Sequence, residues 1–130
     1  MTLYVCLDDR DGMLFNNRRQ SRDRAVLEDI RASVPDVLSI SPFSEKLVRE
    51  AGIPYALVSE DLPENAHFFL ENGDSAALAA RASGVVVYRG NRRYPADVRF
   101  GGDLSRFSLE SKTEFPGHSH EIITKEVYVL

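Results

Sequence analysis

Two short segments of the chain combine arginine with asparagine and could bind an anion. Residues 17–22 read Asn-Arg-Arg-Gln-Ser-Arg and residues 89–94 read Arg-Gly-Asn-Arg-Arg-Tyr, so both contain an Asn-Arg-Arg core. The planar guanidinium group of arginine donates paired hydrogen bonds that match the oxygens of a phosphate or a carboxylate. The pattern predicts an anion-binding site formed by Arg18, Arg19, Arg22, Arg92 and Arg93.

The same segments also fit a simpler interpretation, in which both are solvated loops. Their arginines could then pair with acids of the chain, namely Asp9, Asp11, Asp23 and Asp97. Tyr94, at the end of the second segment, and Phe100 after it could stack on a base of a bound nucleotide or pack against the edge of a sheet. The residues alone leave both interpretations open.

The histidines and the single cysteine form no established reactive motif. His118 and His120 are the only clustered histidines, and a hydrolytic zinc site would need further histidines at other spacings. The sequence also lacks a Gly-x-Ser-x-Gly elbow, a Gly-x-x-x-x-Gly-Lys loop and a cysteine pair. We therefore expect no metal, place both histidines in an exposed hairpin loop, and expect Cys6 to be a buried small apolar side chain.

Length and composition are those of one globular domain. The chain has 130 residues, of which 43 % are apolar and 28 % charged, and its formal net charge of −4 argues against bulk nucleic-acid binding. No segment has the apolar length of a membrane helix, and the N-terminus lacks the pattern of a signal peptide. Because one cysteine cannot form an internal disulfide, a cytoplasmic location is expected.

Hydrophobic periodicity predicts strands that alternate with helices. Strands are expected over residues 2–7, 37–40, 53–58, 66–70, 85–88, 105–111 and 122–130, and helices over residues 21–32, 45–51 and 76–82; residues 13–15 form a short apolar segment. The last two strands, joined by a loop with Pro and Gly, predict an antiparallel hairpin. This order describes an α/β fold with a central, mostly parallel mixed sheet flanked by about three helices.

The order of elements resembles dihydrofolate reductase along nearly the whole chain. Residues 4–13, Tyr-Val-Cys-Leu-Asp-Asp-Arg-Asp-Gly-Met, are similar to that family's first strand and the polar turn after it. Residues 20–27 stand where the family has the Trp-x-x-Pro-x-Asp stretch that starts its first helix. An alanine-rich helix, the strand at 85–88, a polar excursion and two final strands resemble the family's C-terminal end. The resemblance implies one dihydrofolate reductase-like domain over residues 1–130.

The resemblance makes Asp23 a candidate catalytic residue. The family carries a proton-donating carboxylate on its first helix, facing the pteridine, and Asp23 stands at the matching position. The alternative is an ordinary acid in the first turn of a helix capped by Ser21, where the helix dipole favours it by about 0.3–1 kcal/mol.

The cofactor-binding motifs of the family are eroded in this chain. The family binds NADPH through a Gly-Arg-x-Thr loop, an arginine-containing loop and a Gly-Gly turn. The matching places here, residues 41–44, 58–61 and 71–74, read Ser-Pro-Phe-Ser, Val-Ser-Glu-Asp and Glu-Asn-Gly-Asp. Ser44 and Gly73 remain as candidate cofactor-binding residues, but the acids beside them would repel the phosphates of a dinucleotide. No cofactor is therefore expected.

Two functions follow from these observations. The favoured hypothesis is a non-catalytic or functionally diverged dihydrofolate reductase-like protein that binds a small anionic molecule, a nucleotide or a partner in an arginine-lined cleft. The alternative is an NADPH-dependent reductase of a pterin-like or other heterocyclic substrate, with Asp23 as proton donor. No membrane partner is expected, and the edge formed by the terminal hairpin is compatible with a homodimer.

Overall fold

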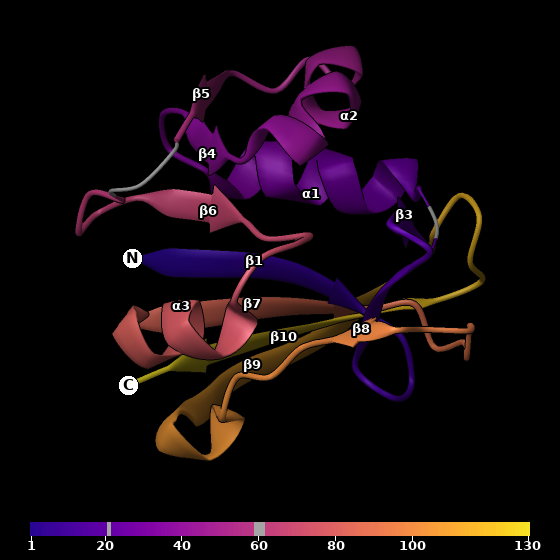
Figure 1. Cartoon of the computed structure of the whole chain (residues 1–130). Coiled ribbons are helices and arrows are strands. Elements are labelled where there is room, and N and C mark those ends of the chain that lie inside the picture. Colours follow the sequence, from indigo (N-terminus) through magenta and orange to yellow (C-terminus); the bar gives the residue numbers. More distant parts are fainter. Residues whose placement is uncertain (21, 59–61) are drawn as a thin grey trace.

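A mixed β-sheet forms the centre of the molecule. The computed structural model describes residues 1–20, 22–58 and 62–130. Within them, seven strands form one sheet in the order β5-β4-β6-β1-β7-β10-β9 (Figure 1). Their bounds are β1 Thr2–Leu7, β4 Leu38–Ile40, β5 Tyr55–Leu57, β6 His67–Phe69, β7 Gly84–Arg89, β9 Ser108–Phe115 and β10 Ile123–Val129.

The strand pairings confirm the predicted sheet. Strand β1 pairs in parallel with β6 and β7, and β4 pairs in parallel with β5 and β6. Strand β10 is antiparallel to both β7 and β9, which confirms the C-terminal hairpin. The inner strands are continuous apolar runs because helices cover both faces of the sheet, as the fully buried stretch from Gly84 to Tyr88 shows.

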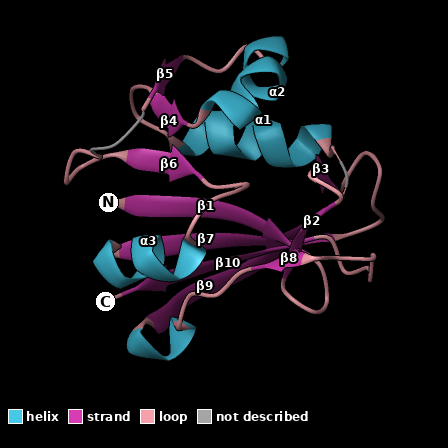
Figure 2. Ribbon diagram, in the orientation of Figure 1, coloured by secondary structure: helices cyan, strands magenta, loops and turns pink. Residues whose placement is uncertain are grey.

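Three α-helices cover the sheet in the described residues, α1 Arg24–Ser33, α2 Glu45–Glu50 and α3 Ser75–Arg81 (Figure 2). Val26 and Ile30 of α1 pack with α2 in one core cluster, whereas Ala79 of α3 belongs to the cluster on the opposite face. Successive residues of β1 belong alternately to the two core clusters, so Val5 lies in the cluster of α3 and Tyr4 in the cluster of α1. None of the helices described is long and apolar enough to cross a bilayer.

A small second sheet, which was not expected, lies against one end of the first. Strand β2 (Gly12–Phe15) pairs antiparallel with β3 (Arg18–Arg19) and with β8 (Val98–Arg99). Asn16 and Asn17 join β2 to β3 with φ angles of 51° and 59°, the left-handed conformation that two-residue hairpin turns require and that asparagine tolerates. None of these three strands was predicted, because strands of two to four residues carry too little periodicity.

Several element boundaries also differ from the prediction. The hairpin strand expected at 105–111 is β9, which begins later, because Leu104–Arg106 forms a 3₁₀ turn. Pro42–Ser44 forms another 3₁₀ turn before α2. Helix α1 begins after Asp23, which is its N-cap rather than a first-turn residue. The predicted cap at Ser21 lies outside the described residues.

Candidate functional site

A pocket opens at the carboxyl ends of the central parallel strands. Its wall comes from the ends of β1, β6 and β7, from α1 and α2, and from the loops that follow β7 and β9. Ligands of open α/β sheets bind at this end of the strands. The space between the walls, including the open solvent at the mouth, is about 710 Å³. The lining residues are Cys6, Leu7, Asp8, Met13, Gln20, Arg22, Asp23, Val26, Leu27, Leu47, Phe69, Leu70, Glu71, Tyr88, Gly90, Tyr94, His120 and Ile123.

Cys6 faces this pocket, so the expectation that it is a buried apolar side chain was wrong. It lies on the same face of β1 as Tyr4, but the protein leaves it exposed to the pocket. Desolvation by the protein that surrounds the pocket, followed by the negative charges of Glu71 and Asp23, raises the pKa of the Cys6 thiol to about 12. The pocket therefore holds a neutral thiol at physiological pH.

The high pKa of Cys6 predicts low reactivity in spite of its exposure. Only the thiolate attacks alkylating agents, so at pH 8 the folded protein should react with iodoacetamide roughly a thousandfold more slowly than a simple thiol. Mass spectrometry reports the modification directly because Cys6 is the one cysteine of the chain. The same protein unfolded in urea is the control and should react at the rate of a simple thiol. Equal rates in the two states would contradict this assignment.

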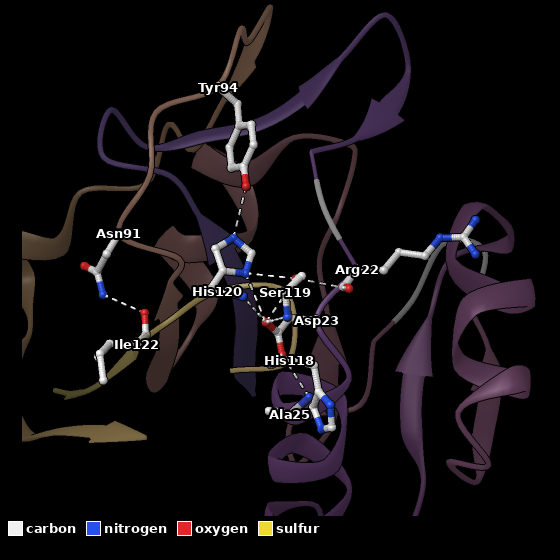
Figure 3. Close-up of polar contacts among 9 residues, drawn as sticks. All are labelled: Arg22, Asp23, Ala25, Asn91, Tyr94, His118, Ser119, His120 and Ile122. Carbon is white, nitrogen blue, oxygen red and sulfur yellow. Dashed lines mark hydrogen bonds and ion pairs between the residues drawn. The ribbon is translucent and has the colours of Figure 1, made fainter. Parts of the chain in front are cut away.

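Asp23 lies in the pocket wall and is enclosed by the loop before β10 (Figure 3). Its Oδ1 accepts hydrogen bonds from the backbone N–H of Ala25 (2.9 Å) and of His118 (3.1 Å). Its Oδ2 accepts bonds from the N–H of Ser119 (3.0 Å) and of His120 (3.2 Å), and from the Ser119 hydroxyl (3.1 Å). The chain's own donors thus occupy both oxygens.

These donors determine the charge of Asp23. Burial alone would raise the pKa of its carboxyl, but the bonds from His118 N–H, the His120 ring and the other donors hold that pKa well below its usual range. Asp23 occupies the place expected from the resemblance, but it is ionised at neutral pH. A carboxylate in this state has no proton to donate to a ligand.

His120 connects Asp23 to Tyr94. The His120 Nδ1 lies 3.0 Å from Asp23 Oδ2, and its Nε2 lies 3.1 Å from the Tyr94 hydroxyl. The imidazole ring is buried, so the prediction of an exposed His120 was wrong, whereas His118 is exposed as expected. His120 is buried because the Asp23 carboxylate accepts hydrogen bonds from three successive backbone N–H groups of this loop, from His118 to His120.

Two glycines make room for this arrangement. A Cβ atom on Gly90 would lie 2.8 Å from His120 Nε2, and one on Gly117 would lie 2.6 Å from Asp23 Oδ2. Both distances are shorter than real Cβ contacts, so any side chain at either position would displace the buried pair. Sequence analysis missed this role, although Gly117 directly precedes the His-Ser-His segment.

A second buried cluster closes the pocket at the end of β6. The Glu71 carboxylate accepts two hydrogen bonds from the Arg19 guanidinium, at 2.7 and 2.8 Å, and one from the Ser44 hydroxyl at 2.7 Å. The Arg19 guanidinium also lies over the Phe43 ring, 5.3 Å from its centroid. Arg19 and Ser44, predicted to bind an anion and a cofactor, are therefore both engaged by Glu71. Gly73, the other cofactor candidate, lies in an exposed turn with a φ of 98°.

The five predicted arginines do not gather at one site. Of these, Arg22 lines the pocket, and Arg92 lines a separate shallow depression with Asn91 and Glu121. Arg18 and Arg93 are exposed and line neither hollow. The repeated Asn-Arg-Arg core reflects turn geometry instead, because both of its asparagines have left-handed backbones, with φ of 59° at residue 17 and 58° at residue 91. In the described part of the chain, no three His, Cys, Asp or Glu side chains are grouped as metal ligands.

The sheet order, the flanking helices and the pocket at the strand ends together define the fold class. The chain has the fold of dihydrofolate reductase. Among solved structures it is similar to dihydrofolate reductase from Enterococcus faecalis complexed with NADP(H) and RAB-propyl, with a TM-score of 0.68 over 98 % of this chain and 94 % of that chain. The sequence identity is 10 %, so this likeness shows the fold alone. No family model and no curated protein matches the sequence.

Proposed function

We propose that the chain is a functionally diverged protein of this fold that binds a small molecule in the pocket without NADP(H). The ligand class that fits is a flat, mostly apolar compound with one anionic group. Apolar side chains supply much of the wall, among them Met13, Leu27, Leu47 and Phe69. Such walls favour an apolar body, and a few polar groups then set its orientation.

The observation that carries the proposal is the distribution of charge in the pocket. The Asp23 and Glu71 carboxylates are satisfied by protein donors, and so is Asp8, which accepts bonds from the N–H groups of Arg10, Gly12 and Tyr94. Arg22, in contrast, lines the pocket, is exposed and makes no ion pair with any described residue. Figure 3 shows its guanidinium pointing away from the Asp23 cluster. A ligand anion would supply the missing partner.

Two of the three expected cofactor positions, residues 41–44 and 71–74, do not fit NADP(H), and residues 59–61 of the third lie outside the described part of the chain. The similar solved structure is a complex with NADP(H), and the alternative reductase function needs that cofactor as its hydride source. In this chain, the buried Glu71 carboxylate stands at the turn where the family has Gly-Gly, and it engages the Ser44 hydroxyl. A fixed negative charge there opposes the phosphates of a dinucleotide. We therefore derive no hydride transfer.

The test uses 8-anilinonaphthalene-1-sulfonate, a flat aromatic anion that fluoresces in apolar surroundings. Saturable fluorescence is expected with the folded protein, and Arg22→Ala should weaken its binding about five- to tenfold, equivalent to roughly 1 kcal/mol for the lost ion pair. Arg93→Ala is the matched control, because that arginine is exposed and lies outside the pocket lining, and it should leave the affinity unchanged.

Two results would overturn the proposed function. One is equal binding of the dye by the wild type and Arg22→Ala. The other is a saturable rise of the melting temperature with micromolar NADPH, which would restore the reductase alternative. Cys6→Phe adds an independent check, because a phenyl ring at the pocket wall should exclude the dye.

A further inference from the structure

We propose that Asp23, His120 and Tyr94 form a proton relay, and that Tyr94 exchanges a proton with a carbonyl compound bound in the pocket. The activity is a keto–enol tautomerisation that needs no cofactor. The substrate class is a flat 2-keto acid with an aromatic body. This inference rests on the proposed function, since the compound must first bind in the pocket.

The relay is a continuous line of hydrogen bonds within the pocket wall. It runs from Asp23 Oδ2 to His120 Nδ1 over 3.0 Å, and from His120 Nε2 to the Tyr94 hydroxyl over 3.1 Å (Figure 3). All three residues line the pocket. They come from the start of α1 and from the loops after β9 and β7, so only the folded chain brings them together.

The hydrogen-bond partners determine where the protons lie. Asp23 is a carboxylate that can only accept, so His120 Nδ1 must carry a proton and donate it. Nε2 of the neutral ring is then an acceptor, and the Tyr94 hydroxyl donates to it. A carboxylate that orients an imidazole, which in turn polarises a hydroxyl, is the arrangement by which proteins activate weak proton-transfer groups. Here the polarised group is the Tyr94 oxygen.

Tyr94 is held in place by one contact of its backbone and one of its ring. Its backbone N–H donates to Asp8 Oδ2 at 3.1 Å, and its ring meets the His120 ring edge to face, with centroids 6.3 Å apart. His120 is in turn confined by Gly90, where a Cβ would lie 2.8 Å from Nε2. A fixed geometry of this kind is what general acid–base catalysis requires.

The proposed reaction is balanced without any co-reactant. The Tyr94 oxygen takes a proton from the carbon next to the substrate carbonyl while the Tyr94 proton passes to His120 Nε2. The electron pair of the broken C–H bond forms the C=C bond, and the carbonyl π pair moves onto oxygen. Tyr94 then donates a proton to the substrate oxygen, and His120 Nε2 returns its proton to Tyr94. The product is the enol, and the relay is back in its starting state. The charge of Asp23 stabilises the imidazolium form of His120 in between.

Phenylpyruvate is the probe, because it is a flat aromatic 2-keto acid whose enol is followed by its ultraviolet absorbance. It should displace the bound dye, and the protein should accelerate conversion between keto and enol forms. Tyr94→Phe and His120→Gln should each lower kcat roughly a hundredfold with little change in KM. Tyr128→Phe is the matched control, because the Tyr128 hydroxyl bonds Glu126, outside the pocket lining, and it should leave the rate unchanged.

Asp23 is a positioning residue, so its test uses a spectroscopic signature. In ¹⁵N NMR spectra of the imidazole groups, His120 should show the tautomer protonated on Nδ1, and Asp23→Asn should abolish that preference. Displacement of the dye without any acceleration, or unchanged kcat in Tyr94→Phe, would overturn the relay while leaving the proposed function intact. Failure of phenylpyruvate to displace the dye would overturn the substrate class. Failure of the dye itself to bind would contradict the proposed function instead.

Discussion

Asp23→Ala is expected to lower the free energy of unfolding by about 3–5 kcal/mol, because each of several buried donors left without a partner costs about 1–3 kcal/mol. The substitution deprives the N–H groups of His118, Ser119 and His120 of their acceptor and also removes the N-cap of α1. Buried donors without a partner bear the full cost of lost hydration. Urea denaturation followed by far-ultraviolet circular dichroism measures the effect.

The chain offers a matched control for this experiment at the start of α3. Asp74 is also an N-cap, but it is exposed and its side chain accepts one described bond, from the N–H of Ala77. Asp74→Ala should therefore cost only about 1 kcal/mol, the usual value of a cap. Similar losses in the two variants would show that the loop does not depend on Asp23.

The same carboxylate predicts how stability depends on pH. The pKa of Asp23 is depressed in the folded protein below its unfolded value of about 4, so the unfolded state binds the proton more readily. The stabilisation from Asp23 is thus complete above that value and is lost as the pH falls below it toward the folded pKa. The free energy of unfolding of the wild type should decrease below about pH 4, and the decrease should be smaller in Asp23→Asn. Asp8, whose pKa is also lowered, contributes to the decrease in stability at low pH that remains in Asp23→Asn.

Removal of Glu71 is expected to have the second large effect. Glu71→Met should cost about 2–4 kcal/mol, because it leaves the Arg19 guanidinium, whose side chain is 17 % exposed, without its charged partner. The hydrogen bonds that Arg19 donates to Glu71, followed by the charge attraction between the two, raise the pKa of Arg19, so this arginine stays charged. Thermal and urea denaturation measure the loss.

A double-mutant cycle separates the ion pair from simple packing. Arg19→Met alone should also destabilise the protein, whereas the double variant Arg19→Met/Glu71→Met should be more stable than either single variant, because it removes both charges at once. Arg18→Met is the control, since that neighbouring arginine of β3 is exposed, and it should change stability by less than about 0.5 kcal/mol. Additive losses in the double variant would contradict the coupling between Arg19 and Glu71.

The amino-acid sequence by itself determined the order of elements and the class of fold. Continuous apolar runs such as the one at 85–88 predict buried parallel strands. Segments with helical periodicity lie between these strands and predict helical crossover connections. The mixed sheet could therefore be derived from local patterns. The resemblance also pointed to Asp23, which lies in the pocket. These features depend on residues close together in the chain, where spacing alone decides which face a side chain occupies.

Only the tertiary structure decided what the site residues do. The burial of His120 depends on Asp23, 97 positions away, and Arg19 is bound by Glu71, 52 positions away. No local pattern records such pairings, so His120 was expected in an exposed loop and Arg19 in an anion site. Cys6 was misplaced because period-two alternation assigns a face of β1 but not whether that face is packed or open. Charged and polar groups take their roles from the partners that folding brings to them, and those partners lie far away in the chain.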